Sequence, residues 1–361
     1  MRYTAAMRKI AIVLAMLAGS VCAFAQVKPC TTATVECEEW IVLGGGPSRA
    51  MVYSSYSLKA PNANVHRALV MVHGTNRNAD HYFETALGAA FLAGAMSDTV
   101  VIAPALHSDE GNCKDKLEKY EVSWSCGGDS WRSGGVAASD KKLTSFDFVD
   151  ELLHRLADKK VFPNLTQIVV AGHSAGGQFV ARYAMANRVQ ESLVGVAVSY
   201  VVANPSSYAW PDATRVLPVD DGAPANAVLE WKDEKVHTSY SFGPFADAAK
   251  VPKYDLWPYG LEGRKTGYTA GMSDELLKKQ LVSRKITYLY GQVDTLPLGG
   301  FDGSPDAMAQ GATRRARGEA YVKYIHDTLG ATSKALIVPE CGHNDRCIYT
   351  TDEVWPLIFP K

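Results

Sequence analysis

Short apolar runs alternate with amphipathic stretches along most of the chain after residue 67. The runs are rich in Val, Ile or Tyr, which favours β-strands. We expect strands at residues 68–72, 100–103, 167–171, 194–201, 286–290 and 335–338, with helices between them. Strands that alternate with helices predict an α/β fold with a mostly parallel central sheet, flanked by helices on both faces.

Two of the expected helices have clear sequence signals. Residues 145–159 place a stripe of large apolar side chains on one face, while Asp147 and Asp150 favour the positive end of the helix dipole. The second helix spans about 313–329 and ends at Gly330, since glycine readily adopts the left-handed conformation that ends helices. Both helices are expected to pack against the sheet.

Two alternating runs near the start, residues 39–43 and 51–58, flank the sequence Gly44-Gly45-Gly46-Pro47. A nucleotide-binding loop would need a helix directly after its glycines, whereas another strand-like run follows here. We therefore interpret the two runs as antiparallel strands joined by a turn.

About eighty residues separate the strand that ends near residue 202 from the strand that begins at residue 286, far more than an ordinary connection. We expect an insertion at about residues 204–284 that forms a cap or lid. Its aromatic side chains can build a pocket wall or a satellite core, and the core is the expected place for most of them. These residues are Tyr208, Trp210, Trp231, Tyr240, Phe242, Phe245, Tyr254, Trp257, Tyr259 and Tyr268.

A serine stands at a sharp turn between a predicted strand and a predicted helix. It is Ser174 in Gly172-His173-Ser174-Ala175-Gly176, after the strand at 167–171 and before a helix at 178–187. The glycines let strand and helix crowd together, and such a turn exposes the hydroxyl group. Ser174 could instead only cap the helix. The strand-turn-helix context favours a nucleophile.

A serine hydroxyl needs a base to take its proton and a third group to orient that base. His343 is the candidate base, because it alone among the histidines follows both Ser174 and the last predicted strand. Asp294 is the candidate acid, since it follows the strand at 286–290. Asp302, further along the same glycine-rich stretch, is the reserve.

Two backbone N–H groups are candidates for stabilising the oxyanion of an acyl-transfer intermediate. Ala175 directly follows Ser174 at the start of a helix, where free N–H groups favour negative charge. The second candidate is Thr75, in the loop after the strand at 68–72, with Asn76 as the next choice. His73 is expected to pack beneath this loop rather than take part in the chemistry.

The order of these motifs resembles the α/β-hydrolase superfamily over most of residues 50–361. The resemblance rests on strand-Gly-His-Ser-Ala-Gly-Gly-helix, on the upstream His-Gly-x-Asn-x-Asn loop, and on the downstream Gly-x-x-Asp and Gly-His sequences. Within the superfamily, some residues are similar to a group of secreted microbial hydrolases that includes esterase-like proteins. These residues are Trp124, Gly127, Gly128, Trp131 and the run at 204–208. Lipases with a His-Gly-Gly-Gly loop differ, because Thr75 and Asn76 stand here in place of glycines. The resemblance implies the α/β-hydrolase fold and a serine hydrolase.

Composition narrows the possible partners. The 361 residues include 37 basic and 38 acidic side chains and are 47% hydrophobic, which fits one large globular domain at residues 26–361. The balanced charge lacks the excess of basic residues that is typical of proteins that bind nucleic acid or an anionic membrane surface. No His-Glu-x-x-His or comparable ligand spacing occurs, so we expect neither a metal nor another cofactor.

Residues 1–25 have the features of a signal peptide. Arg2, Arg8 and Lys9 precede an apolar stretch at 10–18, and Ala23-Phe24-Ala25 matches the small-x-small cleavage rule. The apolar stretch is too short to span a bilayer. We expect export without a membrane anchor, to the periplasm or to the medium.

The chain has seven cysteines, and cleavage after Ala25 would remove Cys22 and leave six. An even number in an exported protein favours disulfides. The six fall into three close pairs, so local bridges are the simplest choice: Cys30–Cys37, Cys113–Cys126 and Cys341–Cys347. A zinc site is the less favoured alternative, because no Cys-x-x-Cys spacing occurs.

Together these features predict hydrolysis of a carboxylic ester through an acyl-enzyme intermediate on Ser174. The substrate would be a small-molecule or polymer ester. The same residues can cleave amides, so a peptidase or amidase is the alternative, and a catalytically silent binding protein is the third possibility. The sequence leaves open the acyl and alcohol groups of the substrate and the oligomeric state.

Overall fold

The computed structural model describes residues 28–127, 130–217 and 240–361; the predicted signal peptide and Trp231 lie outside them. The strands of the main sheet are β1 (Glu38–Val42), β2 (Arg49–Ser54), β3 (Arg67–Val72), β4 (Thr99–Pro104), β5 (Gln167–His173), β6 (Ala197–Ala203), β9 (Ile286–Gly291) and β10 (Lys334–Val338). Within the described residues these eight strands lie in the order β1-β2-β4-β3-β5-β6-β9-β10. The β1–β2 and β2–β4 pairs are antiparallel and the other neighbours are parallel. The mostly parallel sheet is therefore confirmed.

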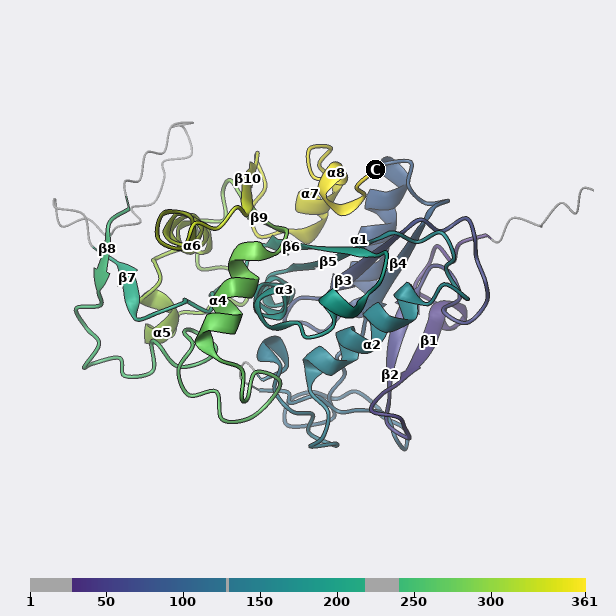
Figure 1. The fold of residues 1–361 in the computed structure, drawn as a ribbon, viewed down its shortest axis with the longest axis horizontal. Coiled ribbons are helices and arrows are strands. Elements are labelled where there is room, and N and C mark those ends of the chain that lie inside the picture. The colour runs from purple at the N-terminus through teal and green to yellow at the C-terminus, as the bar shows by residue number, and fades with distance from the viewer. Residues whose placement is uncertain (1–27, 128–129, 218–239) are drawn as a thin grey trace, which may run out of the picture.

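Helices cover both faces of this sheet (Figure 1). One face carries α2 (Ser145–Ala157), α3 (Ala175–Ala186), α4 (Asp274–Ser283) and α6 (Arg314–Leu329). The other face carries α1 (Ala79–Leu92), α7 (Asp345–Thr350) and α8 (Trp355–Ile358). Shorter elements are η1 (Val35–Cys37), η2 (Trp131–Ser133), η3 (Gln190–Ser192), α5 (Pro305–Met308), β7 (Thr214–Val216) and β8 (Phe242–Pro244).

The continuous apolar runs of the central strands follow from burial on both faces. Successive side chains of a strand point to opposite sides of the sheet. In β3, Val70 belongs to the core on the α2–α3 side, whereas Leu69 belongs to the core beneath α1. Val170 and Val169 of β5 divide in the same way. The interior positions of these strands therefore need apolar residues, and the alternation typical of a half-exposed strand is absent.

The observed ends of several strands and helices match or differ from the predicted ends for local reasons. β6 begins at Ala197 rather than at residue 194, because Gly195 has a left-handed φ of 71° and Val194 is 89% exposed. α3 begins at Ala175 rather than at residue 178, so the helix starts immediately after Ser174. α6 ends as predicted at Gly330, whose φ is 70°. The glycine-rich turn between β1 and β2 is also confirmed.

Aromatic residues from the predicted insertion at 204–284 pack into the body of the protein. Tyr208 stacks on Tyr321 of α6 with 4.5 Å between the ring centroids, and Trp210 lies 4.9 Å from Tyr324 of the same helix. Both Tyr208 and Trp210 belong to the core on the α2–α3 side of the sheet. These two rings therefore have a core role, while a cap formed by the whole segment stays a prediction.

Asp150 of α2 lies deeper in the protein than the sequence predicts. Only Asp147 lies in the first turn, where it forms a capping box with Thr144. The Asp150 carboxylate is buried and accepts hydrogen bonds from the hydroxyl groups of Tyr183 at 2.6 Å and Tyr268 at 2.7 Å. Burial raises the pKa of Asp150 to about 6, and the two hydrogen bonds oppose only part of that shift.

The buried Asp150 should make the protein less stable as the pH rises from about 4 to 6. In this range the carboxyl group ionises in the unfolded chain but stays protonated in the folded protein, so unfolding releases a proton and becomes easier. Urea unfolding of wild type and Asp150→Asn at pH 4.5 and 7.5 isolates this effect. The free energy of unfolding of the variant, relative to that of wild type, should be about 2 kcal/mol higher at pH 7.5 than at pH 4.5. An equal difference at both pH values would contradict the prediction.

Candidate active site

Ser174 stands on a strained turn between β5 and α3. Its φ of 59° and ψ of −120° are rare for a residue with a side chain. Crowding explains the flanking glycines: a Cβ on Gly172 would lie 2.4 Å from the carbonyl oxygen of Gly176, and one on Gly176 would lie 2.2 Å from that of Val72. The backbone therefore requires glycine on both sides of the serine.

The side chains of Ser174, His343 and Asp294 form one chain of hydrogen bonds. His343 Nε2 lies 2.9 Å from Ser174 Oγ, and His343 Nδ1 lies 2.9 Å from Asp294 Oδ2. An ionised carboxylate can only accept, so His343 Nδ1 donates to Asp294 and leaves Nε2 free to accept from the serine hydroxyl. The three residues thus have the geometry of a nucleophile, its base and an orienting acid.

Strand ends bring these side chains together. Ser174 follows β5, Asp294 follows β9, and His343 follows β10, so all three lie at the carboxyl edge of the parallel part of the sheet. Asn204 follows β6 at the same edge; its Nδ2 donates to the carbonyl oxygen of Gly342, and its Oδ1 accepts from the N–H of Gly291, both at 3.0 Å. Asn204 therefore links the loop that carries His343 to the end of β9, a role that the sequence analysis missed.

The reserve acid Asp302 has other partners. Its carboxylate accepts hydrogen bonds from the Tyr259 hydroxyl at 2.8 Å and from the Ser304 N–H at 3.0 Å. The carboxylate that meets His343 is that of Asp294, and only 3% of Asp294 is exposed. The structure thus favours Asp294 over Asp302.

A second histidine lies against His343. The ring centroids of His173 and His343 are 4.6 Å apart, and His173 Nδ1 lies 3.1 Å from the hydroxyl of Tyr82. Burial lowers the pKa of His173 well below its usual range. His173 is therefore uncharged at neutral pH and does not repel a proton on His343.

One candidate oxyanion donor, Ala175, directly follows Ser174, and the other, Thr75, belongs to a loop at the same cavity. Ala175 is the first residue of α3, so its N–H has no partner within the helix. Thr75 lines the same cavity as Ser174, and no described residue accepts a backbone hydrogen bond from its N–H. His73 packs beneath this loop as expected: it is fully buried, its Nε2 accepts from the Leu106 N–H at 3.1 Å, and burial lowers its pKa to about 4. A donor role for Thr75 and Ala175 stays a prediction.

A cavity of about 390 Å³ opens beside Ser174 and His343. Its other lining residues are almost all polar or glycine: Gly74, Thr75, Asn76, Asn78, His81, Tyr82, His173, Gly299, Gly300 and Asp345. In the described part of residues 204–284, no aromatic ring lines this cavity. The lining of this cavity comes largely from the loops after β3, β9 and β10.

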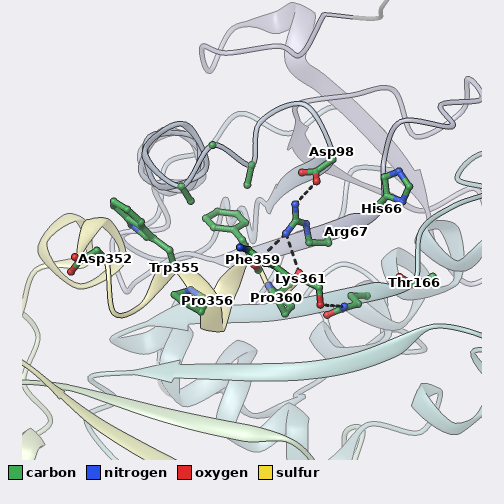
Figure 2. Close-up of a pocket in the computed structure, with 14 residues that line it drawn as sticks. His66, Arg67, Asp98, Thr166, Asp352, Trp355, Pro356, Phe359, Pro360 and Lys361 are labelled. Atoms are coloured by element: carbon green, nitrogen blue, oxygen red, sulfur yellow. Dashed lines mark hydrogen bonds and ion pairs between the residues drawn. The ribbon is translucent and has the colours of Figure 1, made fainter.

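A larger cavity of about 970 Å³ lies at the other end of the parallel strands, where β3 and β5 begin (Figure 2). It is bordered by Arg67, at the first position of β3, and by Trp355 and Phe359 near the end of the chain. Arg67 pairs with Asp98 and donates to the carbonyl oxygen of Phe359 at 3.2 Å. Ser174, Asp294 and His343 do not line this cavity, so it is separate from the candidate active site.

Arg314 of α6 is a further residue that the sequence analysis missed. Its side chain is fully buried and reaches three groups: Asp294 Oδ1 at 3.4 Å, Ser206 Oγ at 2.7 Å and the carbonyl oxygen of Gly299 at 2.8 Å. Burial lowers the pKa of this guanidinium, and the Asp294 carboxylate opposes the shift. Arg314 therefore fixes the position of Asp294 relative to the cavity loop at Gly299.

Arg314→Lys should lower kcat about 10²-fold and leave KM nearly unchanged, because lysine keeps the charge but cannot bridge the three groups that fix Asp294. Steady-state kinetics with a chromogenic ester measures both constants. Arg284→Lys is the matched control, since Arg284 is also buried but binds the carbonyl oxygens of Ala184 and Asn187 rather than Asp294. A folded Arg314→Lys protein with unchanged kcat would contradict the positioning role.

Three disulfides join Cys30 to Cys37, Cys113 to Cys126 and Cys341 to Cys347. The last bridge closes a short loop that contains His343.

Among the described residues, no group of three or more His, Cys, Asp or Glu side chains could hold a metal ion. None of the helices in the described ranges combines the length and the apolar character that crossing a membrane requires.

Comparison with known proteins gives a family and two similar folds. The model of the alpha/beta hydrolase family matches residues 69–354. Poly(aspartic acid) hydrolase-1 from Sphingomonas sp. KT-1 has a TM-score of 0.58 and 20% identity, over 92% of this chain and 100% of that chain. LpqC, a poly(3-hydroxybutyrate) depolymerase from Bordetella parapertussis, has a TM-score of 0.56 and 19% identity, over 86% of this chain and 84% of that chain. No curated protein matches the chain.

Proposed function

The chain belongs to the alpha/beta hydrolase family, and from this premise we propose that it is a serine hydrolase that cleaves a carboxylic ester through an acyl-enzyme intermediate. The observation that carries the proposal is the hydrogen-bonded chain from Ser174 through His343 to Asp294. Such a series of hydrogen bonds makes a serine hydroxyl nucleophilic at neutral pH, because a correctly oriented imidazole accepts its proton as the new bond forms.

Acylation begins when Ser174 Oγ attacks the acyl carbon and His343 Nε2 takes the hydroxyl proton. Asp294 stabilises the imidazolium through its hydrogen bond to Nδ1. The negative charge moves to the former carbonyl oxygen, for which the N–H groups of Thr75 and Ala175 are the proposed donors. The tetrahedral intermediate then collapses: the ester C–O bond breaks, and the leaving alcohol receives the proton from His343.

Deacylation repeats the same proton transfers with water. His343 removes a proton from a water molecule, which attacks the acyl-enzyme carbonyl, and the second tetrahedral intermediate releases the carboxylic acid while Ser174 regains its proton. The uncharged His173 beneath the base supports this cycle, because a protonated His343 meets no positive neighbour there.

The ester preference is tested with a panel of p-nitrophenyl esters against aminoacyl p-nitroanilides. We expect kcat/KM for the best ester to exceed that for the best anilide, since an alcohol leaves more readily than an amine. The two similar structures are named for a polyamide and a polyester, so both bond types belong in the panel. Faster anilide turnover would replace the ester proposal with an amidase or peptidase. Inactivity on both would favour a catalytically silent binding protein.

We also propose that the protein is exported. Three disulfides support this, because such bridges persist in oxidising compartments and are rare in the cytosol. Cell fractionation tests the proposal. Export predicts a mature chain that begins at Gln26, with all three bridges formed, in the periplasm or the medium. A full-length reduced protein in the cytosol would contradict it.

A further inference from the structure

One carboxylate on the wall of the catalytic cavity has no part in the proposed reaction. Asp345 begins α7, two residues after His343, and lines the cavity together with Ser174. Its side chain keeps 13% exposure. His81 Nε2 lies 2.9 Å from its Oδ2, and Thr85 donates its hydroxyl to the same oxygen at 2.8 Å. The carboxylate is thus fixed in place at the edge of the space that a substrate would fill.

No arginine or lysine balances this charge inside the cavity. None of the lining residues described carries a guanidinium or ammonium group. Arg314 is fully buried behind Asp294, and Arg77, next to the lining loop, donates to the carbonyl oxygens of Leu106 and Ser125. Asp345 is thus the one acidic side chain among the described residues that line the cavity, and the imidazole of His81 is the titratable group that contacts it.

The rest of the lining also disfavours a long hydrocarbon. Pockets for apolar ligands are walled mainly by aliphatic and aromatic side chains. Among the described lining residues, Tyr82 supplies the one large ring outside the histidines, and its hydroxyl contacts His173. Hydrogen-bonding side chains such as Asn76 and Asn78 take the place of aliphatic ones.

We propose that this cavity takes short polar esters with a positively charged group a few atoms from the scissile bond, and that the Asp345 carboxylate selects them. The proposal rests on the serine hydrolase function proposed above. At a separation of several ångströms, a fixed carboxylate in a partly enclosed site favours a cation over a neutral group of the same shape by about five- to tenfold. The same charge disfavours anionic substrates.

Two pairs of equal-shaped esters test the proposal from either side of the ester bond. On the acyl side, p-nitrophenyl 4-(trimethylammonio)butyrate is compared with p-nitrophenyl 5,5-dimethylhexanoate. On the alcohol side, acetylcholine is compared with 3,3-dimethylbutyl acetate. At pH 8.5, where imidazole side chains are in general uncharged, the cationic ester of at least one pair should have the higher kcat/KM after correction for spontaneous hydrolysis.

Asp345→Asn should bring that ratio close to one, because asparagine has the same shape and still accepts hydrogen bonds but carries no charge. Asp352→Asn is the matched control: it removes one exposed negative charge that does not line the cavity, and its ratio should equal that of wild type. Equal rates within both pairs in wild type, or a preference that survives in Asp345→Asn, would overturn the proposal.

Asp345 also ties α7 to α1, so the variant could fail to fold. Wild type then decides alone: the cation preference should shrink between about 0.02 M and 0.5 M NaCl, because salt screens the carboxylate. A preference that salt does not change would overturn the proposal. Fluorophosphonate labelling of Ser174 distinguishes a failure of this inference from a failure of the proposed serine hydrolase function. Intact labelling without charge selectivity removes only this inference, whereas an unlabelled wild type removes the proposed function itself.

Discussion

Asparagine in place of Asp294 should lower kcat about 10⁴-fold with little change in KM. The carboxylate accepts the proton of His343 Nδ1 at 2.9 Å, which keeps Nε2 free to act as the base. An amide can present its NH₂ group to Nδ1 instead, and the imidazole would then carry its proton on Nε2. In that tautomer His343 cannot accept the proton of Ser174. Steady-state hydrolysis of a p-nitrophenyl ester measures the loss.

Asp302→Asn is the control for this experiment, because it makes the same chemical change in the same loop. The Asp302 carboxylate is bonded to Tyr259 and Ser304 rather than to His343. We expect its kcat to stay close to that of wild type. A collapse of kcat in Asp302→Asn, with an active Asp294→Asn, would assign the acid to Asp302 instead.

Ser174→Ala should lower kcat about 10⁶-fold, the largest effect of any substitution considered. The change removes the oxygen that forms the acyl bond and leaves the His343–Asp294 pair in place. Residual hydrolysis would come only from binding and from the oxyanion donors. Ser192→Ala is the matched control, since Ser192 is an exposed serine in η3. Retention of a tenth of the wild-type kcat in Ser174→Ala would contradict a nucleophilic role.

Sequence patterns predict which residues meet at the site, because the three central residues each follow the end of a strand. Ser174, Asp294 and His343 each follow a short apolar run, and parallel strands end at a common edge. Once the runs are recognised as neighbouring strands, residues separated by more than a hundred positions are expected to meet. The glycines beside Ser174 add a second signal, because they are needed only where helix and strand are in close contact.

Other parts of the site depend on tertiary packing that leaves no local signal. Arg314, Arg315 and Arg317 lie at the start of the predicted helix at 313–329, where a cluster of arginines is normally solvated. Arg314 and Arg317 are nevertheless fully buried and donate to loops that precede α6. Asp345 looks like an ordinary first-turn carboxylate of a short helix. Its place on the cavity wall follows from how α7 packs on α1, which no spacing along the chain encodes.

The central claim is that Ser174 is an activated nucleophile, and covalent labelling tests it most directly. The folded, oxidised protein is treated with a fluorophosphonate probe, digested and sequenced by mass spectrometry, with Ser174→Ala alongside. The proposed function predicts one adduct per chain, located on Ser174, lost in the variant and abolished by prior unfolding. An unlabelled Ser174 in the folded protein, or an adduct on another serine that persists in Ser174→Ala, would contradict it.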